Sequence, residues 1–123
     1  MNKEHKKVLV VDDDLGILEA LQAILEEEGY IVTVADNGGY IENLPVDDLP
    51  NLILLDILLS GKDGRTIARQ LKNQASTCHI PIILLSAHPN LKKDATSCGA
   101  DDFVAKPFDI DALLTKIEQH LVP

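Results

Sequence analysis

The apolar positions of this 123-residue chain form short runs rich in Val, Ile and Leu, which alternate with longer stretches at helical spacing. Such runs are typical of strands buried on both faces of a parallel sheet, and the longer stretches are typical of helices packed against it. The pattern predicts five strands, at Val8–Val11, Tyr30–Ala35, Leu52–Leu55, Ile80–Leu85 and Phe103–Ala105. It predicts five helices, at Leu15–Glu28, Gly39–Leu44, Asp63–Gln74, Leu91–Ser97 and Ile110–Leu121.

This strict alternation indicates an α/β fold in which helices cover a parallel sheet. The length suits a single domain over residues 1–123, with a core at residues 7–121. Right-handed crossovers would bring the loops after the first, third, fourth and fifth strands to one edge of the sheet. Ligands of open α/β sheets bind outside the carboxyl ends of the strands, so polar residues there are the candidates for function.

Composition excludes several classes of protein. The longest apolar runs have four or five residues, too few to span a membrane, and the polar N-terminus does not resemble a signal peptide. A net charge of −9 argues against direct binding of nucleic acid. Cys78 and Cys98 fit no metal or redox spacing. We therefore expect free thiols in a cytoplasmic protein.

Polar side chains follow four of the predicted strands. Asp12-Asp13-Asp14 follows the first strand, Asp56 the third, Ser86 the fourth and Lys106 the fifth. Several carboxylates at one site repel each other unless a cation is present, and oxygen ligands favour Mg²⁺, with Mn²⁺ as an alternative. A carboxylate beside a divalent ion and a lysine can act as a nucleophile toward phosphorus. The pattern thus predicts phosphoryl chemistry at this edge.

Five motifs in order carry a resemblance to a known family. They are Val10-Val11-Asp12-Asp13, Leu54-Leu55-Asp56-Ile57, Gly61-Lys62-Asp63-Gly64, Leu85-Ser86-Ala87 and Phe103-Val104-Ala105-Lys106-Pro107-Phe108. From about Lys7 to Leu121 the chain resembles the response regulator receiver domain of two-component signalling. The resemblance implies a flavodoxin-like three-layer sandwich with strand order 2-1-3-4-5. It also implies a phospho-accepting switch rather than an enzyme, with only self-phosphorylation from a donor and slow autodephosphorylation.

The resemblance assigns a role to each residue of the predicted site. Asp56 matches the phospho-acceptor and one of the Mg²⁺ ligands. Asp13 would bind Mg²⁺ directly and Asp12 mostly through water, and the backbone carbonyl of Leu58 would be a further ligand. Lys106 matches the lysine that pairs with the phosphoryl group.

The resemblance also implies a switch and a set of partners. Ser86 and Phe103 match the hydroxyl and aromatic residues that move together on phosphorylation, and the Lys106–Pro107 bond would be cis. The donor would be a histidine kinase or a histidine phosphotransfer protein. The face formed by the fourth helix, fifth strand and fifth helix would bind a downstream protein or effector domain, or a second copy in a homodimer. Ser60, where the family usually has proline, and His88 are departures, and Leu58 and His88 occupy the two variable positions that tune phosphoryl lifetime in the family.

Simpler roles and rival functions remain open at this stage. Asp14 and Asp63 suit helix caps, and Gly61 and Gly64 suit the backbone geometry of a tight loop. A Mg²⁺-dependent phosphohydrolase with an aspartyl nucleophile is a second hypothesis, but its general acid would stand at Leu58. A receiver that binds partners without taking phosphate is a third. The presence of every chemical group that the reaction needs counts against it.

Overall fold

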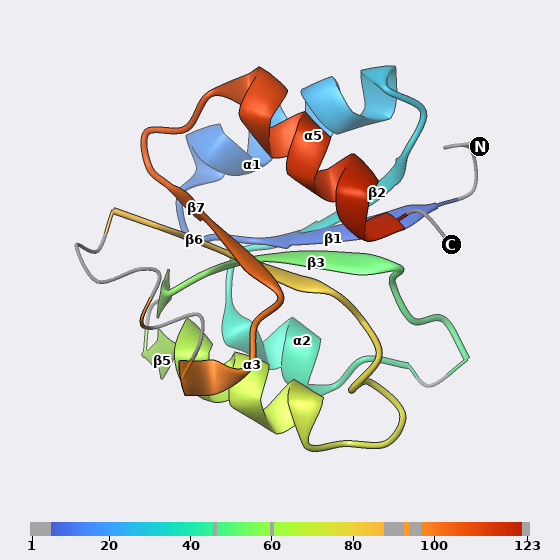
Figure 1. Ribbon diagram of the computed structural model, residues 1–123, viewed down its shortest axis with the longest axis vertical. Helices are drawn as coiled ribbons and strands as arrows, with labels where there is room; N and C mark the ends of the chain where they lie inside the picture. The colour runs from blue at the N-terminus through green and yellow to red at the C-terminus, as the bar shows by residue number, and fades with distance from the viewer. Residues whose placement is uncertain (1–5, 46, 60, 88–92, 94–96, 122–123) are drawn as a thin grey trace.

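A sheet of five parallel strands forms the middle layer of the computed structural model, which describes residues 6–45, 47–59, 61–87, 93 and 97–121 (Figure 1). The strands are β1 (Lys7–Val11), β2 (Ile31–Ala35), β3 (Leu52–Asp56), β6 (Ile82–Ser86) and β7 (Asp102–Ala105). Their order across the sheet is β2-β1-β3-β6-β7. This confirms the predicted order 2-1-3-4-5, because β6 and β7 are the fourth and fifth strands of the sheet.

Helices cover both faces of this sheet, which confirms the three-layer α/β sandwich (Figure 1). On one face lie α1 (Leu15–Glu27) and α5 (Ile110–Leu121), and on the other lie α2 (Gly38–Glu42) and α3 (Gly64–Lys72). The described residues thus contain four of the five predicted helices. The remaining prediction, at 91–97, falls mostly outside the described residues.

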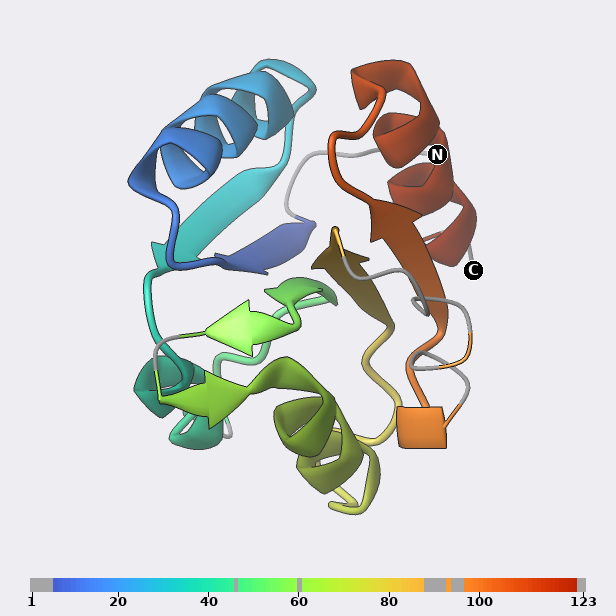
Figure 2. The same ribbon diagram turned by 90° about the vertical axis from the view of Figure 1, so that its left-hand side faces the viewer.

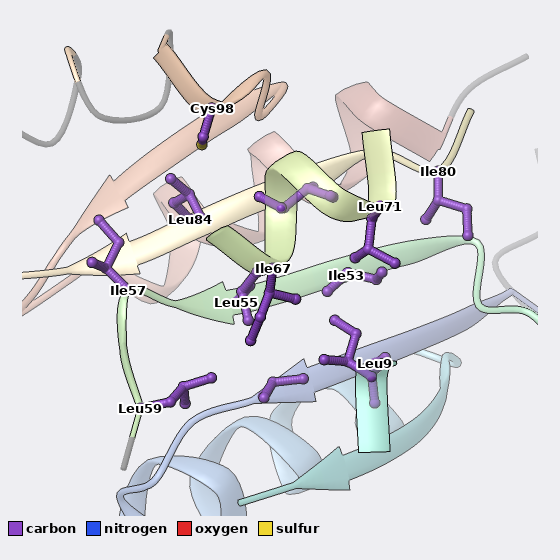
Figure 3. Close-up of a cluster of buried hydrophobic side chains, with 14 residues drawn as sticks. Leu9, Ile53, Leu55, Ile57, Leu59, Ile67, Leu71, Ile80, Leu84 and Cys98 are labelled. Atoms are coloured by element: carbon purple, nitrogen blue, oxygen red, sulfur yellow. The ribbon is translucent and has the colours of Figure 1, made fainter. Parts of the chain in front are cut away.

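The core has two halves, one on each face of the sheet. Every residue of β3 and of β6 is buried, as expected for parallel strands covered on both sides. Ile53 and Leu55 belong to the cluster under α2 and α3, whereas Leu52 and Leu54 belong to the cluster under α1 and α5. Figure 3 shows the first cluster, in which Ile67 of α3 lies over β3. The apolar runs therefore fix the central strands and place their carboxyl ends at one edge.

Apart from shifts of one or two residues at the ends of other elements, two features differ from the expectation. A small antiparallel hairpin, β4 (Leu58–Leu59) paired with β5 (Lys62–Asp63), follows β3, and it was not predicted because two-residue strands carry no periodicity. The fourth strand of the sheet begins at Ile82 rather than at Ile80. Pro81 has no N–H to donate to the neighbouring strand, so regular pairing begins after it.

Neither cysteine forms a disulfide, and Cys78 is exposed whereas Cys98 is buried in the core. Among the residues that the structure describes, no helix combines the length and the apolar character that crossing a bilayer requires.

Candidate functional site

The strand register brings the predicted site residues to the carboxyl edge of the sheet, which faces the viewer in Figure 2. Val11 of β1 pairs with Leu55 of β3, so Asp12 and Asp56, one residue further on, leave adjacent strands side by side. Across the other half of the sheet Ser86 pairs with Ala105, and Lys106 follows directly. Residues far apart in the sequence thus meet because four strands end at the same level.

Three carboxylates gather at this edge. Each of Asp12, Asp13 and Asp56 offers an oxygen, and these oxygens lie within 4.8 Å of one another. Asp12 is completely buried and Asp56 is only 5% exposed, whereas Asp13 is exposed to solvent. Keeping buried carboxylates this close together in their charged forms costs free energy unless positive charge offsets their repulsion.

Lys106 supplies positive charge to two of these carboxylates. Its Nζ donates to Asp12 Oδ2 at 2.7 Å and lies 3.5 Å from Asp56 Oδ2. Burial lowers the pKa of Lys106, but the hydrogen bond and charge of Asp12, together with Asp56, outweigh burial and leave this pKa raised. Lys106 is therefore protonated at neutral pH. The peptide bond from Lys106 to Pro107 is cis, as predicted.

The charged form of Asp56 remains destabilised despite this lysine. Its pKa is raised to about 6, first because burial removes it from water and second because Asp12 lies close. Lys106 and the backbone N–H of Leu58 lower that pKa only in part. An oxygen-only donor set in which a carboxylate is destabilised by its neighbours fits a hard divalent cation such as Mg²⁺.

The loops around this cluster contain both caps that the sequence predicts. The Asp14 side chain accepts hydrogen bonds from Gly16 N and Ile17 N, and it is the N-cap of α1. The Asp63 side chain accepts from Arg65 N at 2.8 Å and caps α3. Asp14 is therefore a capping residue, which separates it from the Asp12–Asp13 pair.

Leu58, the first residue of β4, lies two residues after Asp56. Its backbone N–H is 3.4 Å from Asp56 Oδ1, and its side chain is one of the most exposed large apolar groups, at 63%. The role of its carbonyl as a metal ligand stays a prediction. Ser60 and His88, the two departures noted in the sequence, lie outside the described residues.

The predicted switch residues occupy neighbouring strands on one face of the sheet. Ser86 is 2% exposed, and Phe103 is half-buried against the core cluster under α2 and α3. Phe103 pairs with Leu84, which is two residues before Ser86 on β6, so both side chains project to the same face. Their placement suits a coupled movement, which itself stays a prediction.

A charged cluster that the sequence did not predict lies beside Phe103. Asp102 accepts from Lys116 Nζ at 2.8 Å and interacts with His120 Nε2 at 3.0 Å, and Lys116 Nζ lies 5.6 Å from the centre of the Phe103 ring. Burial raises the pKa of Asp102, but these partners outweigh it and hold that pKa below its usual range. The available signal was the spacing of Lys116 and His120, four residues apart on one helix face.

A family model and a curated relative both match most of this chain. The family model described as the response regulator receiver domain matches residues 8–118. The phosphate regulon transcriptional regulatory protein PhoB of Pseudomonas aeruginosa is 38% identical over 118 residues, which are 94% of this chain and 52% of PhoB. The chain thus spans about half the length of that curated relative.

Solved structures agree with this match. The signal receiver domain of a signal transduction histidine kinase from Syntrophus aciditrophicus is 34% identical, with a TM-score of 0.86 over 94% of this chain and 89% of that one. The response regulator TrrA from Thermotoga maritima, in complex with Mg²⁺-BeF, is also 34% identical, with a TM-score of 0.84 over 94% of this chain and 99% of that one.

Proposed function

Because the chain belongs to the response regulator receiver domain family, we propose that Asp56 accepts a phosphoryl group from a histidine kinase or a histidine phosphotransfer protein. Domains of this family are signalling modules whose general role is to accept phosphoryl groups, and they are not conventional enzymes. The proposal is carried by one observation. Asp12, Asp13 and Asp56 converge within 4.8 Å, and Lys106 reaches two of them.

The proposed transfer needs no reactant besides the phosphohistidine donor. A carboxylate oxygen of Asp56 attacks the phosphorus of a phosphohistidine whose other ring nitrogen is protonated. The P–N bond breaks as the O–P bond forms, and the donor leaves as neutral imidazole with the electron pair. Lys106, already protonated, moves from Asp12 toward an oxygen of the phosphoryl group, and the Ser86 hydroxyl donates to another.

The residues also fit the Mg²⁺ that the family binds at an acidic pocket. Asp12, Asp13, Asp56 and the backbone carbonyl of Leu58 would hold the ion, with Mn²⁺ as an alternative. When bound, it supplies positive charge that offsets the charge of the phosphoryl group. The three carboxylates orient the site, and their mutual repulsion explains why a divalent ion is favoured there.

The proposed output is a change of surface rather than a chemical product. Phosphorylation adds charge and acceptor oxygens beside Asp56. Ser86 moves toward them and Phe103 turns, which changes the face of the fourth helix, β7 and α5. We propose that residues 7–121 act as one cytoplasmic receiver domain. This face would meet a downstream protein, an effector domain or a second copy of the chain.

One residue distinguishes this switch from the phosphohydrolase alternative. A hydrolase with an aspartyl nucleophile needs a general acid near its leaving group, and Leu58 occupies the position where that acid would stand. The leucine side chain cannot give or take a proton. The resulting aspartyl phosphate would therefore persist long enough to act as a signal.

The test is labelling with acetyl phosphate and Mg²⁺, followed by intact-mass measurement and mapping of the modified residue. We expect one acid-stable, base-labile phosphoryl group on the wild type and none on Asp56→Asn. Asp14→Asn is the matched control, because asparagine also caps helices and should leave labelling unchanged. Labelling that persists in Asp56→Asn, or that maps to a histidine or serine, would exclude Asp56 as the acceptor.

A further inference from the structure

The first residue of α3, Gly64, lies directly against the backbone of the proposed acceptor. Gly64 is buried, and its N–H donates to the carbonyl of Ile57 at 2.7 Å. A Cβ atom built on Gly64 would be 2.2 Å from the backbone oxygen of Asp56 and 2.9 Å from Cα of Ile57. The helix thus begins in backbone-to-backbone contact with the end of β3.

The need for glycine here is steric rather than conformational. Gly29, Gly61 and Gly99 have positive φ values, and Gly64 is not among them. Its backbone conformation is open to any residue, and alanine is intrinsically the better helix former. The contact with the Asp56–Ile57 peptide therefore excludes a side chain.

We infer that Gly64 is a positioning residue for phosphoryl transfer. Because Gly64 has no side chain, the start of α3 can contact the backbone of Asp56, and this contact sets the position of the Asp56 carboxylate relative to Asp12, Asp13 and Lys106. This inference rests on the proposed role of Asp56. It assigns to Gly64 an effect on reaction geometry in addition to the loop geometry expected from the sequence.

A methyl group at this position cannot be accommodated by one side alone. Asp56 is paired with Leu85 of β6, and Ile57 N donates to Leu85 O at 3.1 Å. The other side is anchored as well, because α3 buries Ile67 in the core (Figure 3). An ordinary C···O contact is about 3.3 Å, so relief requires a displacement of about 1 Å that both sides share. A misplacement of about 1 Å at a reacting group can slow a reaction about 100-fold.

Gly38 provides a matched control elsewhere in the fold. It is likewise the buried first residue of a helix, α2, and is preceded by a capping side chain, that of Asn37. A Cβ on Gly38 would be 2.7 Å from Cδ1 of Ile67 and 3.2 Å from Cγ of Lys62. Both are side-chain atoms that can shift, and neither belongs to the site. Gly38→Ala should therefore crowd the core without moving Asp56.

The experiment compares Gly64→Ala, Gly38→Ala and the wild type by phosphorylation rate at saturating acetyl phosphate and Mg²⁺, with thermal melts to verify folding. We expect Gly64→Ala to be phosphorylated about 10- to 100-fold more slowly. Its amide spectrum should show shifts at Asp56 and Ile57, and its Mg²⁺ affinity should fall. Gly38→Ala should keep the wild-type rate even if its melting temperature drops. A folded Gly64→Ala with the wild-type rate would overturn the inference.

If Gly64→Ala does not fold, the same contact is tested with a variant that destabilises the start of α3. Asp63→Ala removes the cap that holds the start of α3, and Asn37→Ala removes the equivalent cap of α2. Phosphorylation should slow in Asp63→Ala beyond any effect in Asn37→Ala, and equal rates would overturn the inference. Asp56→Asn is labelled in parallel. Failure of the wild type to be labelled, or labelling of Asp56→Asn, would refute the proposed function instead.

Discussion

Replacing the Asp56 carboxylate with an amide should stabilise the protein when divalent ions are absent. In the folded state the pKa of Asp56 is raised from 3.8 to about 6, because the group is buried and lies beside Asp12. A carboxyl group whose pKa is higher when folded binds its proton more tightly in the native state. The contribution of this group to the free energy of unfolding is therefore fully present at low pH. It is lost as the pH rises from 3.8 to about 6.

The size of the effect follows from that difference. A shift of about 2 pKa units, at about 1.4 kcal/mol each, corresponds to at most about 3 kcal/mol at pH 8. At pH 5 roughly half of this cost has developed. Asp56→Asn removes the charge and loses little else, since the bond from Leu58 N is long at 3.4 Å and Lys106 lies 3.5 Å away. For a domain of this size the gain is roughly 10 °C in melting temperature.

The assay is urea unfolding followed by circular dichroism in a chelating buffer at pH 8 and pH 5. Asp56→Asn should exceed the wild type by more at pH 8 than at pH 5, and the exposed cap variant Asp14→Asn should match the wild type at both. Saturating Mg²⁺ should narrow the gap, because an ion that binds the native wild type adds about 2.7 kcal/mol at a hundredfold excess over its Kd. If Asp56→Asn is no more stable than the wild type at pH 8 without divalent ions, burial and the charge of Asp12 do not destabilise the Asp56 carboxylate as described.

The remaining predictions concern the ion, the lifetime of the phosphoryl group and the switch. Asp13→Asn should weaken Mg²⁺ binding, measured by stabilisation against heat, more than Asp14→Asn does, and equal losses would contradict the choice of the acidic pair. Leu58→Asn should hydrolyse its aspartyl phosphate faster than the wild type, because a polar side chain can orient the attacking water, and an unchanged decay rate would show that position 58 does not control access. Ser86→Ala should still bind beryllofluoride, a phosphoryl mimic, yet its amide shifts should stay near the site. Undiminished shifts at Phe103 in that variant would show that the coupling bypasses Ser86.

The sequence predicts the central sheet well because its signals are local and strong. The runs that become β3 and β6 are apolar at nearly every position, and only strands covered on both faces tolerate such runs. Asp12 and Asp56 could be placed together for the same reason, since parallel strands end at a common edge. To predict each side chain of the candidate site, it was therefore enough to know where a strand ends and which residue type follows it.

What the sequence could not supply are contacts set by exact positions in three dimensions. The clash at Gly64 depends on how closely α3 approaches the end of β3, and no periodicity encodes that distance. The attachment of Lys116 and His120 to Asp102 depends on how α5 lies along the last strand. Lys106 was expected to face the acids, but only the structure shows that its Nζ lies closer to Asp12, at 2.7 Å, than to Asp56, at 3.5 Å.

The ion pair between Lys106 and Asp12 joins residues 94 positions apart, at the end of the first strand and the end of the last. During synthesis the acidic residues emerge long before this lysine, so a growing chain carries the repelling carboxylates without the cation that offsets them. The phosphoryl site can therefore be complete only after β7 has docked against β6. Competence to receive a signal would then coincide with completion of the fold, and a partly synthesised or truncated domain would not compete with the finished protein for phosphoryl donors.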